Sequence, residues 1–168
     1  MEDFNEIIKA VDDIGEADDR RRDTFAEEFE HFEAGEIETF TGTRACIDKE
    51  RSLLSDLEEL LEQERENLDQ LIEESEFLSV EQAVRHRDQT IEKLTDHLEH
   101  LETFHDAMST GLDIVEENLE TLETDGPEAI DADPERHFEE AQEAIEAHNE
   151  AVEGLQTNME ILSVYLAH

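Results

Sequence analysis

Glu and His residues at the spacing of metal ligands are the clearest candidates for chemistry in this chain. Glu28 and His31 form one Glu-x-x-His pair, and Glu102 and His105 form a second. Residues three apart lie on one face of a helix, so each pair presents a carboxylate beside an imidazole. Folding the predicted helices antiparallel brings Glu50 and His148 level with the pairs. One hypothesis is a metal site made of Glu28, His31, Glu50, Glu102, His105 and His148.

The same residues also fit a structural role. A chain this rich in Glu contains such pairs by chance, and the pattern resembles that of ferritin-like di-iron bundles only in part, because the last predicted helix has no Glu on its apolar stripe. His105 and His148 lie on apolar stripes, where a buried polar side chain can set the register of packed helices. A third interpretation is a histidine pair at a hydrated helix end. His97 and His100 lie off the stripe and are predicted to face solvent.

The triplet Arg20, Arg21 and Arg22 is the only basic cluster. Arginines recognise phosphate, so a contact with nucleic acid is one interpretation. The triplet is flanked by acidic residues that nearly cancel its charge, which makes nucleic-acid binding an unfavoured alternative. The favoured interpretation is a charged seam in which arginines pair with Glu50 or Glu64 of a neighbouring helix.

Nucleophilic and nucleotide-binding motifs are missing from the sequence. It has no Gly-x-Ser-x-Gly elbow and no glycine-rich phosphate loop. The one cysteine, Cys46, near the start of a predicted helix, is open to activation by the helix dipole, but a structural thiol beside Ile47 is favoured. The sequence therefore predicts a non-enzymatic protein without a cofactor.

The net charge of the 168-residue chain is -39, from 51 acidic and 12 basic residues. At molar salt the Debye length is about 3 Å, so the self-repulsion of such a chain is screened. Acidic excess and few lysines resemble the small acidic helical proteins of haloarchaea, which accumulate salt. That resemblance implies K⁺ and other solvent cations around the surface. An acidic mimic of DNA or a chaperone-like surface is the alternative explanation of the charge.

Hydrophobic spacing predicts an all-α fold. Apolar residues recur in heptads, most regularly at Leu94, Leu98, Leu101 and Leu112. Gly35 predicts a helix end, Ser79 and Gln82 form a capping box, and Asp133 with Pro134 predicts a helix start. The predicted helices span residues 3–34, 43–76, 80–123 and 134–166. Short connections favour an antiparallel up-down four-helix bundle or paired helical hairpins with coiled-coil seams, in one domain over residues 1–168.

The C-terminal segment has more apolar surface than one narrow stripe. The excess predicts either the centre of the bundle or an interface, and we favour a homodimer over a partner helix because symmetric pairing is the commonest kind of oligomer. The predicted interface residues are Met159, Ile161, Leu162, Tyr165 and Leu166. No apolar run approaches the roughly 20 residues of a membrane-spanning helix. No secretory signal is visible either, so the predicted location is the cytoplasm.

Overall fold

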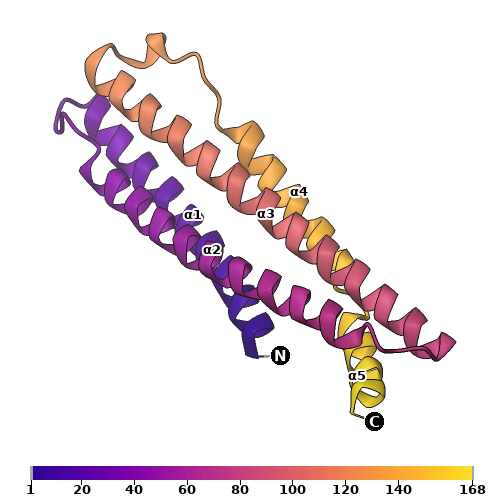
Figure 1. Ribbon diagram of the computed structural model, residues 1–168. Coiled ribbons are helices and arrows are strands. Elements are labelled where there is room, and N and C mark those ends of the chain that lie inside the picture. Colours follow the sequence, from indigo (N-terminus) through magenta and orange to yellow (C-terminus); the bar gives the residue numbers. More distant parts are fainter. Residues whose placement is uncertain (1, 168) are drawn as a thin grey trace. The chain divides into compact units, whose positions relative to one another are not determined.

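The computed structural model describes residues 2–167, with side chains from Phe4 onward. Within this range the chain forms five α-helices, one short 3₁₀ helix and no strand, so the predicted all-α class is confirmed. Figure 1 shows the order of these elements along the chain. The helices are α1 (Glu2–Glu33), α2 (Thr41–Ser75), α3 (Glu81–Thr124), η1 (Pro127–Ala129), α4 (Glu135–Ala151) and α5 (Leu155–Leu166).

Local signals account for several of the helix ends. After α1, Gly35 has φ 73°, and the amide of Glu36 donates to the carbonyl of His31 at 2.9 Å. This is the glycine-terminated helix end that the sequence predicts. Before α4, the amide of Glu135 donates to the Asp133 carboxylate at 3.0 Å, as expected for an N-cap.

The C-terminal region differs from the prediction of one helix over residues 134–166. The structure has two helices there, because α4 ends at Ala151 and α5 begins at Leu155. Gly154 separates them with φ 76° and ψ -1°, a left-handed conformation that glycine adopts without steric cost. The break divides the apolar C-terminal residues from the heptads of α4.

The helices are organised in two compact units. The first contains residues up to Leu60 together with His105–Glu139, and the second contains Leu61–Phe104 and the residues from Glu140 onward. Both α2 and α3 therefore contribute one part to each unit.

In the first unit, apolar side chains from α1, α2 and α3 form the core. The Phe40 ring is 0% exposed and lies 5.6 Å from that of Phe25 and 5.0 Å from that of Phe32, measured between centroids. Gly111 on α3 allows a close approach of α4, since a Cβ there would lie 2.6 Å from Cε1 of Phe138. The other fully buried large apolar residues described in this unit are Ile7, Ile14, Ile47, Leu57, Leu112 and Leu119.

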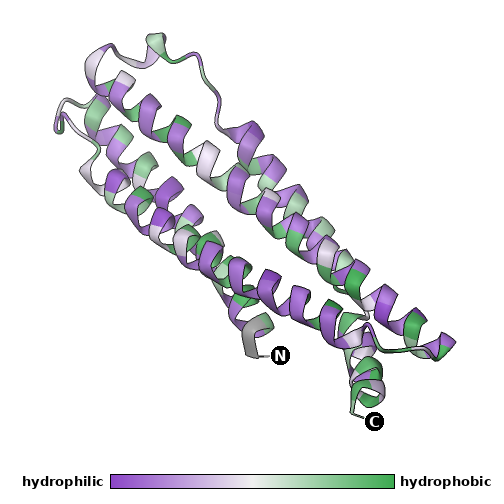
Figure 2. Ribbon diagram, viewed as in Figure 1, coloured by the Kyte–Doolittle hydropathy of each residue, from purple (hydrophilic) through white to green (hydrophobic). Residues whose placement is uncertain are grey.

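In the second unit, α3 provides a regular apolar stripe. Leu94, Leu98 and Leu101 are buried, as the heptad pattern predicts. Leu155 and Leu162, seven residues apart on α5, are each 2% exposed. Figure 2 shows α5 as the helix with the most continuous hydrophobic colouring.

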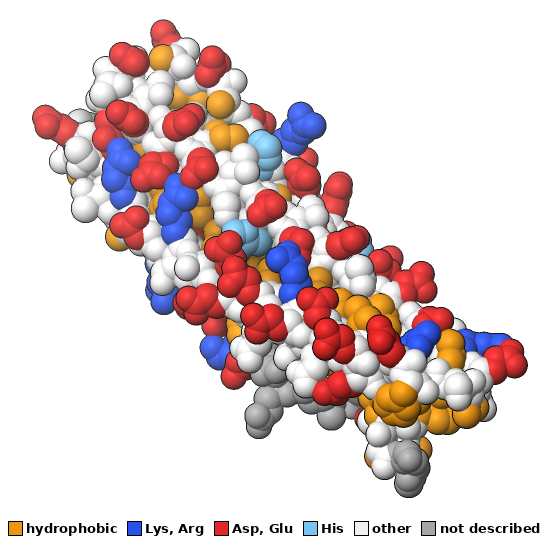
Figure 3. Space-filling model, viewed as in Figure 1, with side chains coloured by type: hydrophobic (Ala, Val, Ile, Leu, Met, Phe, Trp, Pro, Cys, Tyr) orange, Lys and Arg blue, Asp and Glu red, His pale blue; other side chains and the backbone are white. Residues whose placement is uncertain are grey.

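The surface is strongly acidic. Figure 3 shows Asp and Glu side chains spread over the whole face in view. Among the residues that the structure describes, no helix combines the length and the apolar character needed to cross a membrane.

Candidate functional site

A buried ion pair lies in the first unit. Arg21 of α1 is 4% exposed and Glu50 of α2 is 0% exposed, and Nε of Arg21 donates to Oε1 of Glu50 at 2.6 Å. Arg21 also pairs with Asp18, and its guanidinium lies 4.7 Å from the centroid of the Phe138 ring. A buried charge requires such compensation, because leaving water costs several kcal/mol per ion.

The Glu50 carboxyl group is buried, and its pKa is shifted as a result. Burial raises its pKa to about 7, although the neighbouring Arg21 opposes that shift. Its Oε2 atom has no hydrogen-bond partner among the described residues. The favoured interpretation of the sequence, an arginine of the triplet paired with Glu50, is therefore confirmed for Arg21.

The three consecutive arginines do not form one basic surface. Arg21 is buried, and Arg22 forms ion pairs of 2.9 Å with Asp18 and 2.8 Å with Glu135. Arg20 is exposed and forms no ion pair with a described residue. Two of the three nucleic-acid candidates thus form ion pairs with carboxylates of the first unit.

A buried histidine pair lies in the second unit. His97 of α3 is 0% exposed and His148 of α4 is 4% exposed. Nε2 of His148 lies 2.7 Å from Nδ1 of His97, a hydrogen bond in which one ring donates and the other accepts. The prediction that His97 faces solvent is wrong. His97 lies beside the stripe of Leu98 and Leu101, and α4 packs over it through His148. The prediction of a core-facing His148 is confirmed.

Both imidazoles are held neutral by their surroundings. Burial lowers the pKa of His97 to about 4, with repulsion from His148 and then from His100 adding to the effect. Burial also lowers the pKa of His148, and a hydrogen bond to Asn149 opposes this shift. The pair is therefore a neutral polar contact between α3 and α4.

Two of the predicted metal ligands, Glu28 and His31, have other partners in the structure. The Glu28 carboxylate accepts hydrogen bonds from the Gly42 amide at 3.1 Å and from the Thr43 hydroxyl at 2.7 Å. Glu28 thus caps the N-terminus of α2, where the helix dipole favours a negative charge. His31 is exposed and contacts Glu36, which raises the pKa of His31.

The remaining ligand candidates do not form a metal centre with other described residues either. Glu102 pairs with Arg65 in the second unit, whereas His105 is half-buried in the first unit and lies 3.1 Å from Asp106. Within the described part of the chain, no three His, Cys, Asp or Glu side chains lie close enough together to hold a metal ion. The six residues Glu28, His31, Glu50, Glu102, His105 and His148 are not brought into such a group.

The predicted interface residues are divided between two faces of α5. Leu162 is buried in the second unit, whereas Met159 is 37% exposed. Val164, which lies on the same helix, is 59% exposed. The half-buried residues are Ile161, Tyr165 and Leu166. Outward apolar surface therefore remains on α5 after the second unit has packed.

Comparison of the chain with protein-family models, with curated proteins and with solved structures finds no match.

Proposed function

We propose that this protein is a non-enzymatic helical module that self-associates through the apolar end of its second unit. In this proposal it acts in a high-salt cytoplasm, with K⁺ around its acidic surface and with coiled-coil contacts along its helices. The proposal is supported by what its buried polar groups do. Arg21 and Glu50 contact each other, as do His97 and His148, so each pair joins two helices.

One observation carries the proposal. Most of the exposed large hydrophobic residues belong to the second unit, on α5 and around the turn between α2 and α3, whereas Ile8 belongs to the first. We call this set the apolar end: Ile72, Phe77, Val80, Met159 and Val164. Phe77 is 66% exposed and Val80 is 61% exposed. Exposed apolar residues that gather in one region are typical of interaction sites.

Charge favours a second copy of the chain as the occupant of the apolar end. Two molecules of charge -39 repel each other wherever carboxylates meet. Glu160 is the single charged residue in the 12 residues of α5. Two copies that approach through α5 therefore bring few like charges together along that helix. Symmetric pairing is also the commonest way for one chain to cover its own apolar surface.

The test combines size-exclusion chromatography with light scattering in about 2 M KCl, a concentration at which surface charges are screened. We expect the unaltered protein to be a dimer. The double variant Phe77→Glu with Val164→Glu should be a monomer with an unchanged circular dichroism spectrum, because the altered side chains are exposed. Ile8→Glu is the matched control, since Ile8 is 42% exposed and belongs to the first unit.

Three outcomes would contradict the proposal. The first is an unaltered protein that is a monomer at every concentration up to the millimolar range. The second is a double variant that remains dimeric, which places the interface outside the apolar end. The third is an Ile8→Glu variant that dissociates to the same extent as the double variant, because the effect would then not be specific to the apolar end.

A further inference from the structure

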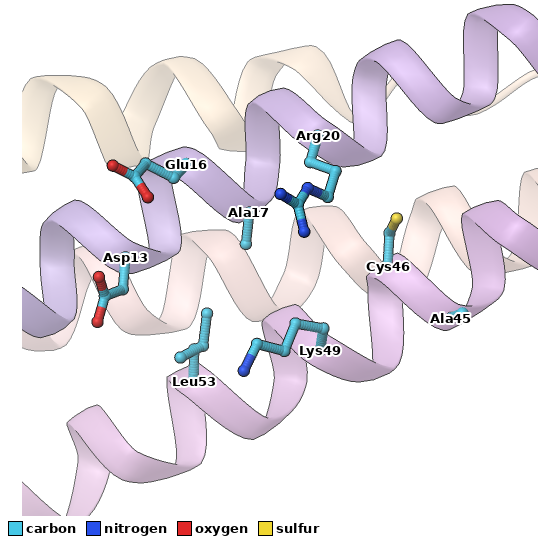
Figure 4. Close-up of a pocket in the computed structure, with 8 residues that line it drawn as sticks. All are labelled: Asp13, Glu16, Ala17, Arg20, Ala45, Cys46, Lys49 and Leu53. Atoms are coloured by element: carbon cyan, nitrogen blue, oxygen red, sulfur yellow. The ribbon is translucent and has the colours of Figure 1, made fainter.

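The first unit contains a second candidate site, a pocket between α1 and α2. It has a volume of about 470 Å³. Figure 4 shows Arg20 directed from α1 toward α2, and Cys46 directed from α2 toward α1. The residues that line the pocket are Asp13, Glu16, Ala17, Arg20, Ala45, Cys46, Lys49 and Leu53.

Two cations of the pocket lack acidic partners. Arg20 and Lys49 form no ion pair and no hydrogen bond with any described side chain, whereas most of the other Lys and Arg residues pair with a carboxylate. The chain has 51 acidic residues, yet two cations without an ion pair line the same pocket. Their positive field is not cancelled by direct contact with an acid.

The acidic residues of the pocket form no ion pair with these two cations. Asp13 is engaged with Lys9, at 2.9 Å between Oδ2 and Nζ. Glu16 and Arg20 are four residues apart, a spacing at which Glu and Arg commonly pair on a helix, but no ion pair joins them. In Figure 4 the carboxylates of Asp13 and Glu16 lie toward one end of the pocket, and Arg20 and Cys46 lie toward the other.

Apolar groups form much of the rest of the lining. Ala17 comes from α1, and Ala45 and Leu53 come from α2. A ligand that matches this lining needs a negative group for Arg20 and Lys49 and a short hydrocarbon part for the apolar side chains. An inorganic oxyanion satisfies only the first requirement.

We propose that this pocket binds a small organic carboxylate, whose charged group is held by Arg20 and Lys49 and whose hydrocarbon part lies against Ala17, Ala45 and Leu53. The site lies in the first unit and is independent of the apolar end of the second unit. The result of the binding test at this pocket therefore does not affect the proposed self-association.

Cys46 provides a specific reporter of this site, because it is the only cysteine in the chain and lines the pocket. Its thiolate displaces iodide from iodoacetate or from iodoacetamide, forming a carbon–sulfur bond and releasing iodide. The two reagents differ in charge, since iodoacetate is a carboxylate and iodoacetamide is neutral. The ratio of their alkylation rates, divided by the ratio for free cysteine, measures how strongly the pocket attracts a carboxylate.

We expect the ratio to fall in Arg20→Gln and in Lys49→Gln, by about threefold for each cation at low ionic strength. Arg136→Gln is the matched control, because Arg136 is also exposed without an ion pair but lies outside the pocket. The measurement uses the lowest KCl concentration at which circular dichroism shows full helix content. An unchanged ratio in both pocket variants would overturn the proposal.

Equilibrium binding is tested by protection of Cys46 from iodoacetamide. Hexanoate should slow alkylation in the unaltered protein and have at least several-fold less effect in the Arg20→Gln, Lys49→Gln double variant. The neutral analogue 1-hexanol and inorganic phosphate, which lack the charge and the hydrocarbon part respectively, should each protect less. Equal protection by hexanoate and 1-hexanol, or by hexanoate and phosphate, would overturn the proposed ligand class.

Discussion

The two units of this protein each bury one polar pair, and the pairs differ in charge. In the first unit, a cation meets a carboxylate at 2.6 Å between Arg21 and Glu50. In the second, two imidazoles meet at 2.7 Å between His97 and His148. All four residues are at most 4% exposed. Burial penalises charge in both places, but only the first unit supplies an opposite charge to offset that penalty.

This difference gives the two pairs opposite responses to pH. Glu50 has a raised pKa of about 7, so its burial is least costly when it is protonated. His97 has a lowered pKa of about 4, so its burial is least costly when it is deprotonated. Acidification should therefore favour the burial of Glu50 in the first unit and oppose the burial of His97 in the second.

The largest expected effect comes from Arg21→Leu, which leaves the buried Glu50 without its cation. We expect a loss of about 3–5 kcal/mol in the free energy of unfolding at pH 8. The loss should be smaller at pH 5, because Glu50 is then protonated. Urea titration followed by circular dichroism measures both values. Arg20→Leu, at an exposed neighbour without an ion pair, should change stability little, and equal losses in the two variants would refute the assigned role of Arg21.

The histidine pair should make the second unit sensitive to acid. The unfolded His97 has a pKa near 6.5 and the folded one about 4, so the unfolded state binds more protons between these values. The stability that depends on His97 is complete above pH 6.5 and falls as pH falls toward 4, by about 3 kcal/mol. The double variant His97→Leu with His148→Leu should lack this component.

The measurement compares unfolding of the unaltered protein and the histidine double variant across pH 4–8. Their difference removes the titration of the many surface carboxylates, which both proteins share. Parallel pH profiles would mean that His97 is already accessible to protons in the folded protein.

Glu50→Gln should show that the pH dependence of stability in the first unit has the opposite sign to that of His97. The folded pKa of Glu50 exceeds the ordinary 4.5, so the unfolded state loses its proton first as pH rises. The contribution of Glu50 is present below pH 4.5 and declines by about 3 kcal/mol as pH rises through 7. The Gln variant should lack that decline, as urea titrations at pH 4.5, 6 and 8 can show. A Gln variant with an unaltered decline would assign it to other groups.

The smallest expected effect on stability is that of Gly111→Ala, at the contact between α3 and α4. Gly111→Ala places a methyl group 2.6 Å from Phe138, whose ring also lies beside the Arg21 guanidinium, and should cost about 1–3 kcal/mol. Gly15→Ala is the matched control, with nothing within 4 Å of the added carbon, and should stabilise the helix by about 0.5–1 kcal/mol. Thermal melts distinguish the two, and a Gly111→Ala melt that is not lowered would contradict the packing at Phe138.

Much of the secondary structure follows from the sequence. Heptad spacing and the signals at Gly35 and Asp133 place most helix ends within a few residues of those observed. The break at Gly154 is missed because the apolar repeat continues through it, although an isolated glycine in a helical pattern is itself a signal for a helix end. Local conformational preference decides these features, so they can be predicted from short stretches of chain.

The polar sites are predicted less well. The spacing identifies Glu28 and His31 as a pair on one face, yet Glu28 reaches the amides at the start of α2 instead of a metal. His97 is assigned to solvent because it lies outside the heptad positions that Leu98 and Leu101 occupy. A helical pattern describes one helix at a time, and the partner of each polar group comes from another helix.

The sequence by itself therefore determines the all-α class, the acidic surface and the apolar stripes, because these depend on composition and on the 3.6-residue period of the helix. Only the tertiary structure decides that Arg21 meets Glu50, that His97 meets His148, and that Arg20 and Lys49 line one pocket. Those outcomes depend on the rotation and axial position of each helix against its neighbour. Displacing one helix by a single turn would exchange every such partner while leaving the apolar pattern of each helix unchanged.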